Sequence, residues 1–225
     1  MGAGALLLGG GRGERLAGRD PKAFALVEGR TLLELALSSV EACPRIEACV
    51  VVAPEGWEGR ARSIAGPRPK LVEVVGGGDT RQSSVSRGLV ALPEALDVVV
   101  CHDVARPFAI PELFEAVLDG LVGADGAVPA VPLPDTVKRV DDGMVTETVP
   151  GEGLVLVQTP QAFRREALVG AHRAAEADGF TATDDAALLE RVGFRVAAVP
   201  GDPSNIKITR PEDLPVASIL ARARA

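Results

Sequence analysis

The sequence has no tyrosine, a single asparagine, and aromatic residues at only 3% of its 225 positions. It also lacks an excess of positive charge, because its net charge is −7. Nucleic-acid-binding proteins rely on aromatic stacking and basic patches, so these absences argue against that class. No apolar run reaches the roughly 18 residues needed to cross a membrane. The three cysteines, Cys43, Cys49 and Cys101, show no metal-binding spacing and favour reduced thiols in the cytoplasm.

The length suits one α/β domain over residues 1–225. Apolar segments alternate with helical patterns, and this order predicts a mostly parallel sheet with helices on both faces. We expect strands over 3–8, 48–53, 70–75, 98–101, 127–133, 154–157 and 194–199, and helices over 31–41, 83–92, 111–121, 165–177, 185–191 and from Pro211 onward.

A predicted β-hairpin interrupts this alternation within residues 133–150. Two β-branched segments, 136–140 and 144–149, flank an Asp-Gly turn. The segments carry few residues for a core of their own, and an isolated hairpin is marginal in water. We therefore expect a protruding arm that packs on a second copy of the chain, which predicts a homodimer.

A glycine-rich, basic loop follows the first predicted strand and runs from Gly9 to Arg15, with Pro21 and Lys22 beyond it. Glycines let the backbone turn sharply and direct its N–H groups toward one point, while the cations suit a polyphosphate. The loop is not a Walker A motif. It also lacks the Gly-x-Gly-x-x-Gly fingerprint, which argues against an NAD-dependent oxidoreductase. An ordinary strand-to-helix turn with solvated charges is the alternative.

Other polar segments also follow predicted strands, where ligands of parallel sheets bind. Residues 76–85 contain three glycines, Asp79 and Ser84. They suit a nucleobase pocket, or Asp79 or Thr80 simply caps the next helix.

Residues 101–107 form another such segment. Asp103 can order Mg²⁺ or bind ribose hydroxyls, and Arg106 can clamp a phosphate. His102 is more typical of a structural residue. Lys207, near the far end of the chain, either returns to the same site or is a solvated charge before the last helix.

Together these motifs resemble the bacterial and plastid 2-C-methyl-D-erythritol 4-phosphate cytidylyltransferases of isoprenoid precursor synthesis, over nearly the whole chain. The resemblance implies a Rossmann-like nucleotidyltransferase fold. It also implies transfer of the cytidylyl group of CTP to methylerythritol phosphate, with release of pyrophosphate and with Mg²⁺ or another divalent cation on the triphosphate. Seven blocks match in order: 11–15 with 21–22, 77–85, 102–107, 134–138, 159–163, 183–185 and 205–213.

The resemblance also implies roles for individual residues. Arg15, Lys22 and Lys207 would be catalytic, with Arg15 and Lys22 neutralising charge as the acceptor phosphate attacks the α-phosphorus in line. No general base is needed, because a phosphate with a second pKa of about 6 is already largely dianionic at pH 7. Nucleotide-binding residues would be Gly9, Gly10, Gly11, Arg12, Gly13, Gly78, Asp79, Arg81, Ser84, Asp103 and Val104. Acceptor-binding residues would be Asp103, Arg106, Thr136 (across the dimer) and Lys207, and Asp103 would also hold the metal directly or through water.

Two positions depart from the family pattern. Gly9-Gly10 stand where the family usually has two alanines, and Pro150-Gly151 stand where it has an acidic residue and an arginine that helps bind the acceptor phosphate. Lys138 or Arg139 can supply a replacement charge. The departures leave two alternatives, a ribitol-5-phosphate cytidylyltransferase and a non-catalytic nucleotide-binding module. The cations retained elsewhere favour an enzyme.

Overall fold

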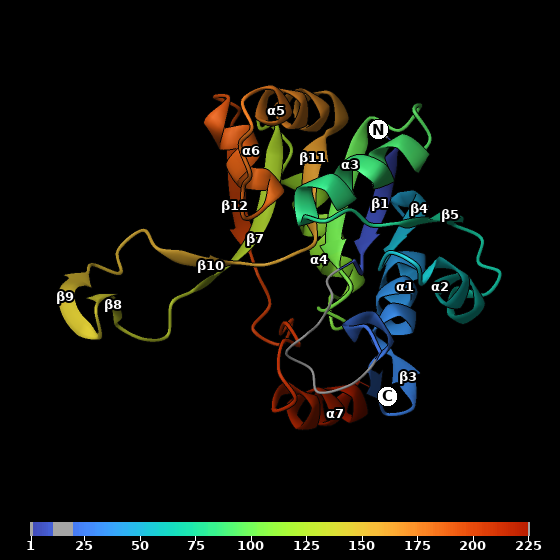
Figure 1. The fold of residues 1–225 in the computed structure, drawn as a ribbon, viewed down its shortest axis with the longest axis horizontal. Helices are drawn as coiled ribbons and strands as arrows, with labels where there is room; N and C mark the ends of the chain where they lie inside the picture. Colours follow the sequence, from blue (N-terminus) through green and yellow to red (C-terminus); the bar gives the residue numbers. More distant parts are fainter. Residues whose placement is uncertain (1, 11–19, 225) are drawn as a thin grey trace.

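The computed structural model describes residues 2–10 and 20–224. Its centre is an eight-stranded sheet (Figure 1). Seven strands follow the order β10-β7-β11-β6-β1-β4-β5, and the eighth, β12, lies off this path and pairs with β7. Strand β1 (Ala3–Leu8) runs parallel to β4 (Ile46–Ala53) and β6 (Val98–Asp103), and β4 runs parallel to β5 (Leu71–Gly76). Strand β12 (Val196–Pro200) is likewise parallel to β7 (Gly126–Pro132).

Two strands run against this direction. Strand β11 (Gln161–Arg164) lies between β6 and β7 and is antiparallel to both, and β10 (Val155–Val157) is antiparallel to β7. The prediction of a mostly parallel α/β fold is therefore confirmed, although β11 was not expected. It spans only four residues directly after Pro160, which is too short for an alternating pattern to be recognised.

Helices cover both faces of the sheet and divide its core in two. One face carries α1 (Leu32–Ala42), α2 (Glu58–Ala65), α4 (Pro111–Asp119) and α7 (Asp213–Ala223), and the other carries α3 (Arg81–Ala91), α5 (Arg165–Ala177) and α6 (Asp185–Arg191). Side chains alternate between the two cores, so Leu7 packs on one face and Leu6 on the other. All residues of β1 and β6 are buried, which explains their continuous apolar runs.

Helix α2 was not predicted from the sequence. Three small elements complete the fold. A 3₁₀ turn, η1 (Lys22–Phe24), precedes the short strands β2 (Leu26–Val27) and β3 (Arg30–Thr31). Within the described part of the chain, no helix has both the length and the apolar character that crossing a membrane requires.

The predicted hairpin is present and stands away from the body of the molecule (Figure 1). Strands β8 (Val137–Asp141) and β9 (Met144–Val149) form a separate two-stranded sheet. Asp142 and Gly143 make the turn with positive φ angles of 44° and 77°. Three apolar side chains of the hairpin, Val140, Met144 and Val145, are exposed to solvent, with Met144 71% exposed. The division into one domain with an arm over 133–150, and the role of that arm between subunits, stay predictions.

Candidate active site

A cleft of about 540 Å³ opens where the parallel strands β1, β5 and β6 end. Ten predicted site residues line it together: Gly9, Gly10, Lys22, Gly78, Asp79, Arg81, Ser84, Asp103, Val104 and Lys207. Gly11, Arg12, Gly13 and Arg15 lie outside the described residues. The rule that polar strand ends converge at one edge of a parallel sheet therefore located the cleft correctly.

The two glycine-rich segments, at Gly9-Gly10 and residues 76–78, pack their backbone closely against the sheet and α3. Gly77 N–H donates to the carbonyl of Ala53 at 2.7 Å, and Gly9 N–H donates to that of Val52 at 2.8 Å. A Cβ on Gly77 would lie 3.0 Å from Ser84 Oγ and 3.1 Å from Ala53 O, so only glycine fits without displacing its neighbours.

Ser84 shapes this wall of the cleft. Its hydroxyl accepts a hydrogen bond from Gly78 N at 3.0 Å and donates to Thr80 O at 2.9 Å. Thr80 is the N-cap of α3 and forms a capping box with Ser83. The helix-cap alternative is thus correct for Thr80, while Asp79 is exposed and faces the cleft.

Asp103 is the buried carboxylate of the cleft and receives two cations. Lys207 Nζ donates to its Oδ2 at 2.6 Å, and Arg81 Nε lies 3.5 Å from its Oδ1. Burial opposes ionisation of Asp103, but the charges of Arg81 and Lys207 outweigh it and lower the pKa to about 2. The carboxylate is therefore ionised at any physiological pH.

The Asp103 backbone is fixed by a hydrogen bond to Thr159, whose hydroxyl in turn contacts His102. Asp103 N–H donates to Thr159 Oγ1 at 3.0 Å, and Thr159 Oγ1 lies 3.1 Å from His102 Nδ1. His102 Nε2 donates to the carbonyl of Arg106 at 3.1 Å. The ring is fully buried, and burial lowers its pKa to about 4, so it is neutral and structural as predicted.

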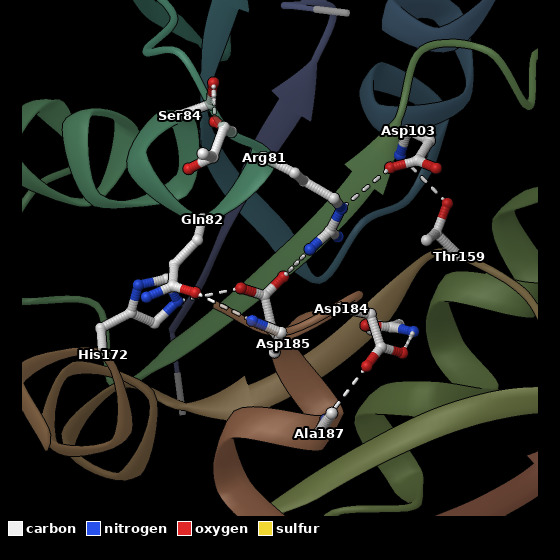
Figure 2. Close-up of polar contacts among 12 residues, drawn as sticks. Arg81, Gln82, Ser84, Asp103, Thr159, His172, Asp184, Asp185 and Ala187 are labelled. Atoms are coloured by element: carbon white, nitrogen blue, oxygen red, sulfur yellow. Dashed lines mark hydrogen bonds and ion pairs between the residues drawn. The ribbon is translucent and has the colours of Figure 1, made fainter. Parts of the chain in front are cut away.

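Arg81 connects Asp103 to a second buried carboxylate, Asp185 (Figure 2). Its Nη1 donates to Asp185 Oδ2, and His172 Nε2 donates to Asp185 Oδ1 at 2.9 Å. Burial raises the pKa of Asp185, but Arg81 and His172 reverse that effect and bring it below its ordinary value. The sequence offered only the Thr183-Asp184-Asp185 block as a signal of this carboxylate and assigned it no role.

Two predicted acceptor residues are not among those that line the cleft. Arg106 turns its guanidinium to backbone carbonyls, donating to Asn205 O at 2.8 Å and to Val157 O at 3.4 Å. It thereby braces the loop that carries Lys207. Thr136 is exposed and lies just before the first strand of the arm. Their acceptor roles stay predictions, as does every assignment of a residue to a ligand.

The site suits a metal that arrives with a phosphorylated ligand. Among the described residues, no group of three or more histidine, cysteine, aspartate or glutamate side chains can hold an ion. One ionised carboxylate in the cleft is nevertheless a typical protein contribution to Mg²⁺, which keeps several waters and binds substrate phosphates. Asp103 fits that requirement.

Relatives of known name match almost the whole chain. The protein of Nitratidesulfovibrio vulgaris named bifunctional enzyme IspD/IspF is 45% identical over 219 residues, which are 93% of this chain but 55% of that protein, so the chain spans about half of that relative's length. The 2-C-methyl-D-erythritol 4-phosphate cytidylyltransferase of Acidobacterium capsulatum is 40% identical, with 98% of this chain and 97% of that protein covered.

A solved structure agrees with these sequence matches. The crystal structure of 2-C-methyl-D-erythritol 4-phosphate cytidylyltransferase from Thermus thermophilus superposes with a TM-score of 0.80 at 38% identity, over 99% of this chain and all of the other. The family model described as IspD, 2-C-methyl-D-erythritol 4-phosphate cytidylyltransferase, matches residues 4–223. The chain therefore belongs to the 2-C-methyl-D-erythritol 4-phosphate cytidylyltransferase family.

Proposed function

We propose that the chain transfers the cytidylyl group of CTP to 2-C-methyl-D-erythritol 4-phosphate, a step of non-mevalonate isoprenoid precursor synthesis. An oxygen of the acceptor phosphate bonds to the α-phosphorus of CTP, and the bond from that phosphorus to pyrophosphate breaks. The products are 4-diphosphocytidyl-2-C-methyl-D-erythritol and pyrophosphate. Family membership supports this reaction, and the observation that carries it is one cleft lined by Lys22, Lys207 and the ionised Asp103.

Each wall of the cleft receives a part of the nucleotide. We assign the triphosphate to the backbone at Gly9 and Gly10, which lines the cleft, and to Gly11, Arg12 and Gly13, which follow them in the sequence. The adjoining segment, with Gly78, Asp79, Arg81 and Ser84, binds the cytosine, while Asp103 and Val104 bind the ribose.

Cations supply the stabilisation of the transition state. Lys22, Lys207 and Arg15 offset the negative charge that gathers on the α-phosphorus as the acceptor attacks, which is where preorganised charge is most effective. Asp103 would hold Mg²⁺, or another divalent cation, which neutralises part of the triphosphate charge when bound. The acceptor needs no base, since its phosphate is largely dianionic at pH 7.

The acceptor side of the reaction extends to a second subunit. We assign Arg106, Asp103 and Lys207 to the acceptor pocket, and we assign Thr136 to the acceptor pocket of the neighbouring subunit. In this proposal the enzyme is a homodimer joined by the arm over 133–150, and it acts in the cytoplasm. The exposed apolar residues Val140, Met144 and Val145 on the arm support this assignment, because an isolated apolar hairpin is poorly stable in water.

The test is release of pyrophosphate by the purified chain with Mg²⁺, each of the four nucleoside triphosphates, and either methylerythritol phosphate or ribitol 5-phosphate. We expect release only with CTP and methylerythritol phosphate. Release with ribitol 5-phosphate alone would overturn the choice of acceptor. No release with any pair would favour a nucleotide-binding module.

A further inference from the structure

A series of polar contacts, partly buried, runs from the cleft to Ser86 on α3. It passes from Asp103 through Arg81 and Asp185 to His172 (Figure 2). Ser86 Oγ then lies 3.1 Å from His172 Nδ1. His172 belongs to α5, Asp185 to α6 and Ser86 to α3, so the contacts join three helices on one face of the sheet. Asp185, His172 and Ser86 have no part in the reaction described above.

Arg81 depends on Asp185 for its position. Its Nη1 donates to Asp185, whereas its Nε is 3.5 Å from Asp103, and its Nη2 is buried without a hydrogen-bond partner among the described residues. The stronger contact is therefore made with Asp185, and it fixes how far the guanidinium extends toward the cleft.

Asp185 is in turn fixed by groups outside the cleft. It is 1% exposed and is the first residue of α6. The preceding Asp184 caps this helix by accepting from Ala187 N at 3.0 Å, and it also accepts from Gln161 Nε2 at 3.1 Å. These bonds place the Asp185 backbone, and His172 then sets the orientation of its carboxylate.

His172 supplies the bond that Asp185 would otherwise lack. The ring is 6% exposed, and since a carboxylate only accepts, Nε2 is the donor to Oδ1. Without that donor, the buried carboxylate would keep Arg81 but lose its other short hydrogen bond, and the neighbouring Cys101 thiol is only a weak donor. The carboxylate would turn to share Arg81 with both oxygens and draw the guanidinium away from Asp103.

We infer that His172 is a positioning residue for the nucleotide site, acting through Asp185 to hold Arg81 beside Asp103. This inference rests on the proposed function for its enzymatic readout, but its first measurement is the affinity for CTP without acceptor, which needs no turnover.

The experiment compares His172→Leu, which removes the donor, with His172→Gln, whose amide N–H reaches a similar point. Calorimetry with CTP and Mg²⁺ should show affinity weakened about tenfold in His172→Leu, the scale of one hydrogen bond to a charged group. It should be restored to within about threefold of wild type in His172→Gln. In turnover, the KM for CTP should rise more than kcat falls.

A matched control separates positioning from simple loss of stability. Ala174→Gly weakens the same helix α5 without touching these polar contacts, and it should lower the Tm while leaving CTP affinity unchanged. Unchanged CTP affinity in His172→Leu, failure of His172→Gln to restore it, or an equal loss in Ala174→Gly would each overturn the positioning role.

If His172→Leu does not fold, Ser86→Ala replaces it and should weaken CTP binding about twofold to threefold, because only the outer contact is lost; unchanged affinity in Ser86→Ala would then overturn the inference. The proposed function is tested on the wild-type chain alone: if that chain neither binds CTP nor releases pyrophosphate, the proposed function is contradicted. The positioning role of His172 is tested by comparing the variants with a wild-type chain that binds CTP.

Discussion

Lys207 Nζ donates a 2.6 Å hydrogen bond to Asp103 Oδ2, joining residues that lie 104 positions apart in the sequence. The loop that carries Lys207 is tied down on both sides of it. Asn205 Nδ2 donates to Thr159 O at 2.9 Å, and Ile208 N donates to Ala105 O at 2.8 Å. The lysine is therefore placed by a buried framework, and Asp103 meets it in a fixed orientation.

Removing a cation of the cleft should slow turnover far more than it weakens the fold. We expect Lys207→Met and Lys22→Ala each to lower kcat by about 10² or more, the scale of one lost charge contact in a transition state. Pyrophosphate release measures the effect. Arg191→Ala is the control, because Arg191 pairs with Asp178 at the surface away from the cleft. Turnover within threefold of wild type in Lys22→Ala would contradict the proposed mechanism.

Acidification from pH 7 to pH 5 should destabilise the chain through His102. Burial lowers the pKa of this ring from 6.5 to about 4 in the folded state. Between these values the unfolded chain binds more protons, so the free energy of unfolding falls as the pH drops through the window. Linkage gives a loss of about 2 kcal/mol by pH 5, above the range in which carboxylates titrate.

Urea unfolding at the two pH values measures this loss. The variant His102→Gln keeps an amide donor but does not titrate, so its unfolding free energy should change less between pH 7 and pH 5. An equal change in wild type and His102→Gln would show that another group is responsible.

The three cysteines should resist thiol reagents in the folded chain. All are buried, and burial raises the pKa of Cys49 to about 12 and the pKa values of Cys43 and Cys101 above the ordinary range. The thiolate is the reactive form. A colorimetric thiol assay at pH 8 should count none in buffer and three in urea, and rapid labelling of the native chain would contradict this burial.

The arm should control assembly. Light scattering at micromolar concentration is expected to show a dimer for wild type and a monomer for the triple variant Val140→Ser, Met144→Ser, Val145→Ser. The control Val122→Ser removes an exposed apolar residue, 90% exposed, from outside the arm and should stay dimeric. A monomeric wild-type chain would remove the role given to the arm.

The sequence predicted the elements with strong local patterns and missed those fixed by distant contacts. Apolar runs located β1 and β6, and polar residues after them located the cleft. Strand β11 escaped because its pairing partners, not its own four residues, make it a strand. The role of Asp185 escaped for the same reason, since its bond to Arg81 spans 104 positions that no periodicity connects.

Strand β11 also has a consequence for how the chain can fold. Among the described residues, strands β6 and β7 do not pair with each other, and β11 is the strand that joins them. A nascent chain that ends within the arm therefore holds the β5-β4-β1-β6 fragment and a separate β7, both with open edges, and open edges of apolar strands invite pairing with other chains. Completion of the sheet is thus a late, non-local event, and fragments that end within the arm should be the most prone to aggregate.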